Sequence, residues 1–279
     1  MPELPEVETV CRGLAPHLLG NKVTKMVARR ASLRWPIPIK ELKQSFLGKE
    51  IVALRRRGKY LLMGVEGGWA LFHLGMSGHL RVEERTIKPR KHDHVDLHLS
   101  PGEDLLRFND TRRFGALLWI PEAEPERHVL LSPLGPEPLG EMFTGRYLHG
   151  RAKARRLAVK NFIMDGRVVV GVGNIYASES LYMAGIHPET ATGALSLSQC
   201  VRLVEAIREI LAQAIEKGGT TLRDFRNGEG KPGYFQQVLA VYGRQGEPCR
   251  QCGAEIQTLR LGQRSSFFCP GCQPASGHG

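Results

Sequence analysis

The sequence predicts an α+β protein of several domains: a β-sandwich opened by an α-helix, then a helical domain, then a small metal-bound β-hairpin. Three observations support this fold class. The chain has 279 residues, 42% of them hydrophobic, which is enough for two domains of ordinary size. Short strand-like runs give way to long helical patterns at a segment with three prolines in seven residues. Four of the six cysteines form two CxxC pairs close to the C-terminus.

The first predicted element is an amphipathic helix over residues 4–18. Its apolar residues recur at spacings of three and four, at Val7, Val10, Leu14 and Leu18, as one buried face of a helix requires. Between residue 22 and about residue 120, short runs with strand character alternate with glycine-rich turns, which favours a β-sandwich. The clearest of these runs are 60–65, 69–74, 94–99 and 116–120.

The prolines of residues 132–138 exclude a helix or a central strand and predict a linker. Helical patterns follow at 146–162, 175–184 and 196–217, and a polar glycine-rich stretch, 226–233, favours a mobile surface loop. We therefore expect a helix plus β-sandwich in residues 1–131, a linker in 132–140, a helical domain in 141–240 and a C-terminal module in 241–279.

The net charge indicates a polyanionic partner. Lys and Arg number 39 against 28 Asp and Glu, which gives +11 and a pI near 9.6, so nucleic acid is the first candidate. An acidic membrane surface is the rival, but no apolar run approaches the roughly 18 residues of a spanning helix. Because the N-terminus also lacks the features of a secretory signal, we expect a cytoplasmic protein.

The two cysteine pairs predict one structural Zn²⁺. Each CxxC knuckle presents two thiolates, and 16 residues separate the knuckles, a spacing typical of tetrahedral zinc sites. Four protein ligands leave no open position for a water nucleophile, so the metal is expected to be structural. The ligands are Cys249, Cys252, Cys269 and Cys272. The other two cysteines, Cys11 and Cys200, fall in apolar helical patterns and are expected to be buried.

Residues 2–6 read Pro-Glu-Leu-Pro-Glu and allow two interpretations. The first is an ordinary helix start, with proline in the first turn and carboxylates near the positive end of the dipole. The second is chemical: removal of Met1 would expose a secondary amine that titrates near about 8. Addition of this Pro2 amine to a sugar carbon gives an iminium, whose fixed charge favours elimination of the 3′ phosphate. Glu3 is placed to pass protons, and Glu6 lies one turn further on.

Further residues suggest contacts with DNA. Met76 lies between two glycines, so it is either a core residue or an exposed apolar tip that could enter a base stack. Arg112 and Phe114 combine a guanidinium with a ring, which suits phosphate contact and stacking, although Phe114 also fits a strand core.

The C-terminal half carries weaker signals of the same kind. A glycine-rich turn ends at Asn174 and opens a helix, as anion sites do, but such a turn is commonly only a cap. Basic residues between 151 and 160, among them Arg155 and Lys160, form either a solvated helix face or a phosphate track. Runs 258–261 and 265–268 suggest a β-hairpin, from which Arg264 either reaches a phosphate or remains a solvated charge.

Together these residues resemble the signatures of the formamidopyrimidine-DNA glycosylase (Fpg, MutM) family. The resemblance covers essentially the whole chain, in segments 1–9, 91–96, 112–115, 134–139, 171–181, 218–222 and 230–235 and in the zinc hairpin. It implies a β-sandwich opened by a helix, a helix-two-turn-helix domain and a C-terminal zinc finger, with no cofactor beyond the zinc.

The resemblance also implies an activity and roles for residues. It implies a base excision repair enzyme, a bifunctional DNA glycosylase and abasic-site lyase, which removes 8-oxoguanine and formamidopyrimidines and cleaves the backbone by β,δ-elimination. Pro2 would attack C1′ with Glu3 as proton donor, while Lys59 and Arg264 would donate protons in the two eliminations. Met76, Arg112 and Phe114 would fill the gap left by the flipped base. Residues 223–234 resemble the loop that closes over that base, and DNA contacts fall at His92, Arg112, Arg155, Lys160 and Asn174.

Two alternatives stay open. Leu4 is typical of the purine-directed branch, whereas the related endonuclease VIII branch, which prefers oxidised pyrimidines, usually has glycine there. A non-catalytic zinc protein that recognises lesions without cutting is the second. Cys11 departs from the family, which commonly has arginine at that place. The expected partner is double-stranded DNA with oxidised bases or abasic sites, bound by a monomer near the nucleoid and away from membranes.

Overall fold

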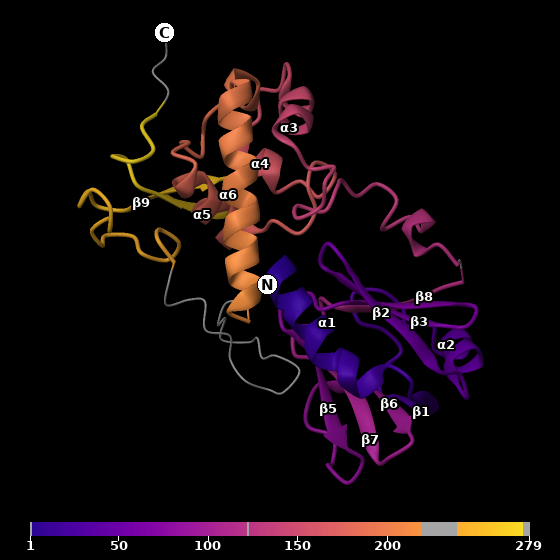
Figure 1. Cartoon of the computed structure of the whole chain (residues 1–279). Coiled ribbons are helices and arrows are strands. Elements are labelled where there is room, and N and C mark those ends of the chain that lie inside the picture. Colours follow the sequence, from indigo (N-terminus) through magenta and orange to yellow (C-terminus); the bar gives the residue numbers. More distant parts are fainter. Residues whose placement is uncertain (1, 122, 219–238, 276–279) are drawn as a thin grey trace. The chain divides into compact units, whose positions relative to one another are not determined.

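The computed structural model describes residues 2–121, 123–218 and 239–275, and the chain divides into two compact units. Of these residues, the N-terminal unit contains 2–121, 123–133 and 217–218, and the C-terminal unit contains 134–216 and 239–275. Strands dominate the first unit, while the second combines helices with one hairpin (Figure 1). The predicted α+β class is therefore confirmed.

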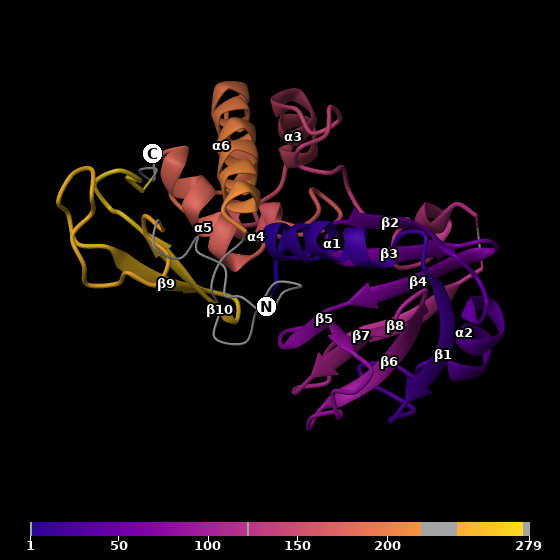
Figure 2. The same cartoon turned by 60° about the horizontal axis from the view of Figure 1, so that its bottom comes forward.

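Two four-stranded antiparallel sheets form the N-terminal unit. One has the order β1 (Lys22–Ala28), β6 (Asp93–Ser100), β7 (Asp104–Asp110) and β5 (Gly78–Glu84); the other has β2 (Ile51–Arg57), β3 (Tyr60–Val65), β4 (Gly68–His73) and β8 (Ala116–Ile120). Both contribute side chains to one core, in which the rings of Phe72 and Phe108 meet edge to face at 5.9 Å. The predicted sandwich is thus present (Figure 2).

Two helices cover parts of this sandwich. Helix α1 (Leu4–Leu18) has the bounds that the apolar periodicity predicts, and it packs against β2, β3 and β5. Its buried face includes Val7, Val10 and Leu14, each at most 1% exposed, and such a stripe is what drives an amphipathic helix onto a sheet. Helix α2 (Ile39–Phe46) contacts β1 and β8, and a short 3-10 turn, η1, spans Pro125–Arg127.

A network of buried charges lies on β5, β6 and β7. Arg107 is 1% exposed, and its guanidinium donates to Asp96 at 2.9 and 3.0 Å and to Glu83 at 2.6 Å. Arg81 donates to Asp93 at 3.0 Å in the same network. A buried charge is tolerated only when it is paired and hydrogen-bonded. The charges on each of these strands are therefore neutralised by residues of the neighbouring strands.

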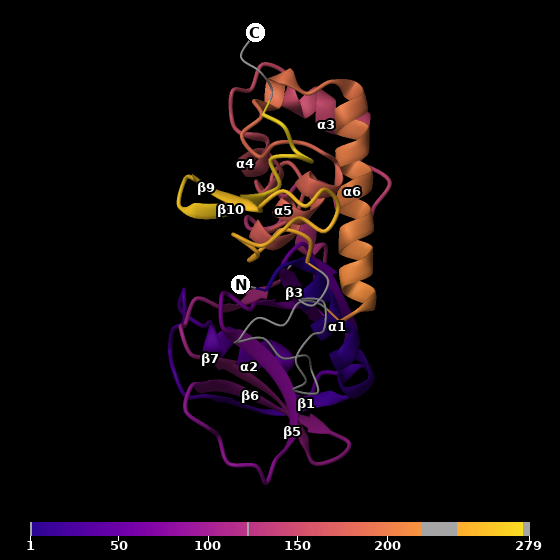
Figure 3. The ribbon, with the colours of Figure 1, turned by 90° about the vertical axis from the view of Figure 1, so that its left-hand side faces the viewer.

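The C-terminal unit is built around its longest helix, α6 (Leu197–Glu216), which contacts α3 (Gly145–Ala152) and α5 (Asn174–Met183). The remaining elements are α4 (Val159–Ile163), the 3-10 turn η2 (Thr192–Ala194) and the hairpin of β9 (Gln257–Leu261) and β10 (Arg264–Phe268). Strand β10 lies beside α5 (Figure 3). Within the described ranges no helix, α6 included, is long and apolar enough to cross a membrane.

The helical pattern over 146–162 does not form one helix, which corrects the sequence analysis. Helix α3 ends at Ala152, Ala154 adopts a φ of +58°, and α4 begins only at Val159. The intervening segment hydrogen-bonds to residues far along the chain instead, because Thr192 donates to Leu157 and Gly193 donates to Arg155 through the backbone, at 2.9 and 2.8 Å. The basic residues therefore lie on two helices and a connection, not on one face.

Candidate active site and metal centre

The start of α1 places Pro2 and Glu3 in a buried position. Pro2 is buried, Glu3 is 3% exposed and Glu6 is fully buried. The Glu3 N–H donates to Glu6 Oε2 at 2.7 Å, while the Glu3 side chain accepts from the Glu6 N–H, so the pair forms a capping box. Two hydrogen bonds in opposite directions fix the backbone at the point where Pro2 enters the helix.

Lys59 lies in the two-residue turn between β2 and β3. Gly58 takes a φ of +56°, a conformation that glycine adopts without strain, and so allows the tight turn. Arg56 holds the turn from inside the sheet: its Nη1 donates to the Gly58 carbonyl at 3.2 Å and its Nε donates to Glu8 of α1 at 2.7 Å. Helix α1, which Pro2 precedes, and the turn that carries Lys59 are thereby joined through one guanidinium.

His73 faces this turn from the neighbouring strand. Its ring lies 5.1 Å from the ring of Tyr60, and its Nδ1 accepts from the Gly75 N–H at 3.0 Å. Burial, together with the positive charges of Lys59 and Arg34, lowers the pKa of His73 to about 4. His73 is therefore neutral near pH 7, with its proton on Nε2 because Nδ1 accepts.

The structure places Met76 at an exposed tip, so the core interpretation is excluded for this residue. Met76 is 38% exposed, in the turn between β4 and β5. Gly75, with a φ of +63°, brings the turn so close to the next loop that an added Cβ would lie 2.4 Å from the Phe114 carbonyl carbon. Only glycine fits at this approach, and the Met76 tip is consequently packed against the loop that carries Phe114.

Arg112 and Phe114 form the second exposed group of this unit. Phe114 is 46% exposed, which excludes a strand-core position, and the Arg112 guanidinium stacks over its ring at 5.0 Å from the centroid. The loop between them turns at Arg113, which has a φ of +59°. The guanidinium and ring that the sequence analysis paired are thus in contact.

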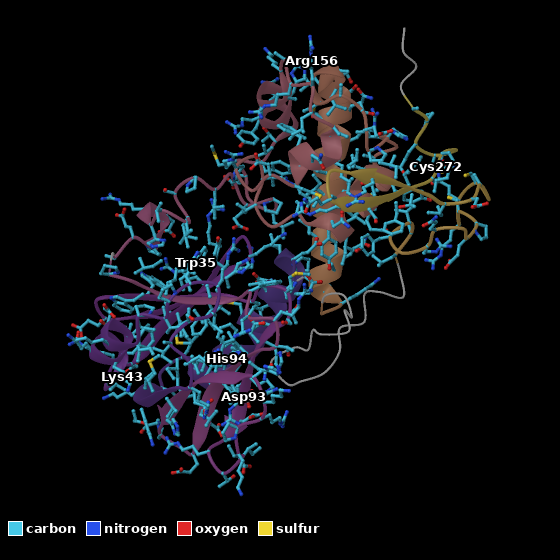
Figure 4. The ribbon with its side chains drawn as sticks, turned by 180° about the vertical axis from the view of Figure 1, so that it is seen from behind. Trp35, Lys43, Asp93, His94, Arg156 and Cys272 are labelled. Carbon is cyan, nitrogen blue, oxygen red and sulfur yellow. The ribbon has the colours of Figure 1, made fainter. Side chains whose placement is uncertain are left out.

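His92 has a left-handed backbone, with a φ of +73°, just before β6. Its carbonyl accepts from the Asp110 N–H at 3.1 Å, and the Lys91 carbonyl accepts from Asn109 Nδ2 at 3.2 Å. A non-glycine residue in this region costs about 1 to 3 kcal/mol, so the two bonds from the end of β7 hold an unfavourable conformation. Figure 4 marks the neighbouring Asp93 and His94 on the sandwich.

In the C-terminal unit, three predicted site residues meet at the start of β10. Lys160 Nζ donates to the Ser265 carbonyl at 3.0 Å and to Ser266 Oγ at 2.8 Å, and Asn174 Nδ2 donates to the same carbonyl at 3.1 Å. Arg264, the preceding residue, is exposed. Lys160 is only 1% exposed, so in this structure its ammonium joins α4 to the hairpin, and its DNA contact stays a prediction.

Arg155 lies in the connection between α3 and α4 and is exposed, with its guanidinium 5.5 Å from the ring centroid of Phe162. It is therefore available to a phosphate, although not from the helix that the sequence suggested. The predicted closing loop, 223–234, lies outside the described residues.

The four predicted ligands form a structural zinc site. Their Sγ atoms all lie within 4.8 Å of one another, with Cys249 and Cys272 at 3.9 Å and Cys252 and Cys269 at 3.4 Å. Tetrahedral zinc with bonds of about 2.3 Å places its sulfurs about 3.8 Å apart, so the cluster fits the ion. Gly271 leaves the room that this needs, since an added Cβ would lie 3.0 Å from Cys252 Sγ. Cys272 is marked in Figure 4.

The titration of these thiols supports the same conclusion. Burial raises the pKa of Cys249, but hydrogen bonds with the Tyr182 hydroxyl and from the backbone of Cys252 and Gln251 lower it more, to about 6. Burial and the neighbouring sulfurs raise the pKa of Cys272 to about 12. Because the sulfurs oppose one another's ionisation, a divalent cation is what stabilises all four thiolates together.

Sequence reasoning missed three positioning residues. Asp110 hydrogen-bonds to the loops of Ser77 and Gly115, and Arg56 joins helix α1 to the turn between β2 and β3. No sequence motif marks either residue. Glu179 of α5 is 3% exposed and accepts from the backbone N–H groups of residues 240–242 at 2.7 to 2.9 Å, which attaches the zinc module to the helices. An acidic residue in the apolar run of α5 was the available signal for Glu179.

Comparison with known proteins agrees with this architecture. The formamidopyrimidine-DNA glycosylase N-terminal domain matches residues 1–117, the formamidopyrimidine-DNA glycosylase H2TH domain matches residues 134–226, and the zinc finger found in FPG and IleRS matches residues 246–275. Fold and cysteine cluster thus define a protein with an Fpg-type N-terminal domain, an H2TH domain and a zinc finger. The chain belongs to the formamidopyrimidine-DNA glycosylase family, as its resemblance implied.

Individual relatives match over nearly the whole length. The formamidopyrimidine-DNA glycosylases of Methylococcus capsulatus and Photobacterium profundum are 55% and 54% identical, over 98% of this chain and all of theirs. Among solved structures, a mutant of Lactococcus lactis Fpg in complex with Fapy-dG containing DNA has a TM-score of 0.91 at 34% identity, over 98% of this chain and 100% of that chain. MutM from Thermus thermophilus has a TM-score of 0.88 at 38% identity, over 99% and 100%.

Proposed function

We propose that this protein is a bifunctional DNA glycosylase and abasic-site lyase, which removes oxidised purines such as 8-oxoguanine and formamidopyrimidines from duplex DNA. The observation that carries the proposal is the buried capping box that holds Pro2 and Glu3 at the start of α1. The similarity to Fpg proteins crystallised with Fapy-dG or abasic-site DNA supports this substrate class, and the net charge of +11 suits a polyanion.

The chemistry begins at the nitrogen of Pro2, once Met1 has been removed. Its lone pair forms a bond to C1′ while the glycosidic bond breaks, and the departing base takes the bonding electrons with a proton that Glu3 supplies. The Pro2 nitrogen then loses its own proton, and O4′ gains one as the C1′–O4′ bond breaks. The opened sugar is left joined to Pro2 through an iminium at C1′. The iminium withdraws electrons from C2′, so that loss of a C2′ proton expels the 3′ phosphate by breaking the C3′–O bond.

Two cations complete the proposed sequence. Lys59, close enough to His73 to depress the pKa of that ring, serves as the proton donor in β-elimination. Arg264, exposed at the hairpin, serves in the δ-elimination that releases the 5′ phosphate. Met76, Arg112 and Phe114 occupy the space of the flipped base, and His92, Arg155, Lys160 and Asn174 contact DNA. The zinc takes no part in the bond changes, because all four of its ligands come from protein.

Borohydride trapping tests the nucleophile. Wild-type protein with an 8-oxoguanine duplex is expected to form a covalent adduct that peptide mapping places on Pro2. Pro2→Gly is expected to abolish or strongly reduce strand cleavage, and Glu3→Gln to lower base release by at least about 100-fold, the usual contribution of a general acid. Glu103→Gln, at an exposed loop position, is the matched control.

Three outcomes would contradict the proposal in different ways. If wild-type protein formed no adduct, the protein would not be an enzyme of this class, and a zinc protein that only binds lesions would be the better hypothesis. Unchanged cleavage by Pro2→Gly would remove the assigned nucleophile but not the class. Faster release of thymine glycol than of 8-oxoguanine from matched duplexes would replace the purine preference with a pyrimidine preference.

A further inference from the structure

Asp110 stands at the end of β7 and is fully buried, and all of its polar groups are used. Its Oδ1 accepts from Ser77 Oγ at 2.7 Å and its Oδ2 accepts from the Gly115 N–H at 2.7 Å. Its backbone N–H donates to the His92 carbonyl at 3.1 Å, and its own carbonyl is bonded to His94 Nε2 at 2.7 Å. One residue therefore connects three loops that are distant in sequence.

These three loops carry the side chains of the N-terminal unit to which DNA contacts were assigned. Met76, Arg112 and Phe114 are exposed, and His92 is half-buried. Ser77 follows the tip residue Met76, Gly115 follows Phe114, and the third connection is to His92 itself. Each connection enters at or directly beside one of these side chains. Loss of the Asp110 carboxylate is therefore transmitted to the loops of Met76 and Phe114, although Asp110 itself is not exposed to a ligand. The connection to His92 uses the main-chain N–H of Asp110 and is kept.

Ser77 extends the connection to Arg112. The Arg112 N–H donates to Ser77 Oγ at 2.9 Å, so the hydroxyl receives one hydrogen bond while it gives its proton to Asp110. A serine hydroxyl has one proton, and its donation to the carboxylate leaves the oxygen lone pairs for Arg112. The close contact of Gly75 with the Phe114 carbonyl also packs the loop of Met76 directly against the loop of Phe114. Met76, Arg112 and Phe114 consequently share one rigid support.

We propose that Asp110 is the positioning residue that sets the geometry of the group that opens the DNA helix, through Ser77 to Met76 and Arg112 and through Gly115 to Phe114. This inference rests on the proposed function, because it takes these side chains to enter the duplex at the lesion. It assigns to Asp110 the opening of the duplex and not the bond changes at C1′.

A distinct kinetic signature follows from this assignment. An 8-oxoguanine within a duplex must be unstacked before it reacts, at a cost of a few kcal/mol, whereas an abasic site has no base to extrude. Misplacement of the opening group by about 1 Å is enough to cost on the order of 100-fold in rate. Loss of Asp110 therefore slows 8-oxoguanine excision much more than cleavage at a preformed abasic site.

The test compares Asp110→Asn with Asp104→Asn, an exposed residue at the other end of β7 that serves as the matched control. We expect Asp110→Asn to lower 8-oxoguanine excision by about 10- to 100-fold and abasic-site cleavage by less than about 3-fold. Ser77→Ala is expected to give a smaller effect of the same kind. The double variant should lose no more than Asp110→Asn alone, because the two side chains act as one unit.

A second readout needs no bond cleavage. The fluorescence of 2-aminopurine placed beside a carbocyclic 8-oxoguanine, an analogue that is not excised, reports unstacking as the protein binds duplex DNA. Asp110→Asn is expected to reduce this rise while Asp104→Asn does not. Equal losses on both substrates, in proportion to a fall in the folded fraction measured by thermal melting, would reduce Asp110 to a structural residue. A wild-type fluorescence rise in Asp110→Asn would overturn the inference. Wild-type protein that opens the duplex but forms no borohydride adduct would instead contradict the proposed function.

Discussion

Buried carboxylates position the sites of both units. Glu6 accepts from the backbone of Glu3, Asp110 from Ser77 and Gly115, and Glu179 from three successive N–H groups. A buried acceptor that loses its donors keeps its desolvation cost, about 1 to 3 kcal/mol or more, so such residues fix a single geometry. Each of these carboxylates accepts from at least one backbone N–H, and Asp110 accepts also from the Ser77 hydroxyl. These carboxylates therefore orient chain segments, and neighbouring residues carry the side chains to which roles are proposed.

Among single residues, His73 makes the stability of the folded protein depend on pH. Its pKa of about 4 in the folded protein is below the ordinary 6.5, so the unfolded chain binds the proton more tightly. The stabilisation from the neutral ring is fully present above about pH 6.5 and is lost as the pH falls toward 4, by about 3 kcal/mol in all. Urea unfolding at several pH values should show this loss in the wild type but not in His73→Asn. Parallel curves for the two proteins would contradict it.

The elements themselves differ in how far local sequence determines them. Helix α1 and strand β3 have the predicted bounds, because α1 buries a regular apolar face and β3 is a short run that is buried almost throughout. The break between α3 and α4 could not be predicted, since the donors to Leu157 and Arg155 come from residues 192 and 193. The exposure of Met76 and Phe114 was left open for the same reason: the contact of Gly75 with the neighbouring loop decides it.

Removal of one partner from the charged network on β5, β6 and β7 should strongly lower the free energy of unfolding. Arg107→Leu leaves the buried Asp96 and the half-buried Glu83 with less compensation, so we expect the free energy of unfolding to fall by about 3 to 5 kcal/mol. Arg127→Leu is the control, because Arg127 and its partner Glu124 are mostly exposed and such pairs contribute little. Denaturant unfolding measures both, and a similar stability of the two variants would show that the network is not needed.

For the molecule as a whole, the proposed nucleophile and the zinc ligands belong to different units. Pro2, Glu3 and Lys59 are in the N-terminal unit, and the zinc ligands are in the C-terminal unit together with Arg264. The zinc module is attached through Glu179, Lys160 and Asn174. Metal loss should therefore alter the hairpin and leave the fold of the sandwich intact.

Cys249→Ser tests this separation. The variant is expected to lose its zinc and to bind duplex DNA about tenfold more weakly, or about 1.4 kcal/mol, because the hairpin loosens. Released zinc is measured with a chromogenic chelator, and affinity by fluorescence anisotropy. Cys200→Ala, which alters a buried thiol outside the cluster in the same unit, should keep its zinc. Unchanged duplex binding after complete zinc loss would contradict the expected role of the hairpin.

The hydrogen bonds to the Ser265 carbonyl determine which substitutions the hairpin tolerates at this position. Lys160 and Asn174 both donate to the main-chain carbonyl of Ser265, and the side chain at this position is exposed. A peptide oxygen is the same whichever amino acid supplies it. Evolution can therefore exchange the side chain beside Arg264, and with it the chemistry offered at the hairpin, without detaching the finger from the helices that carry it.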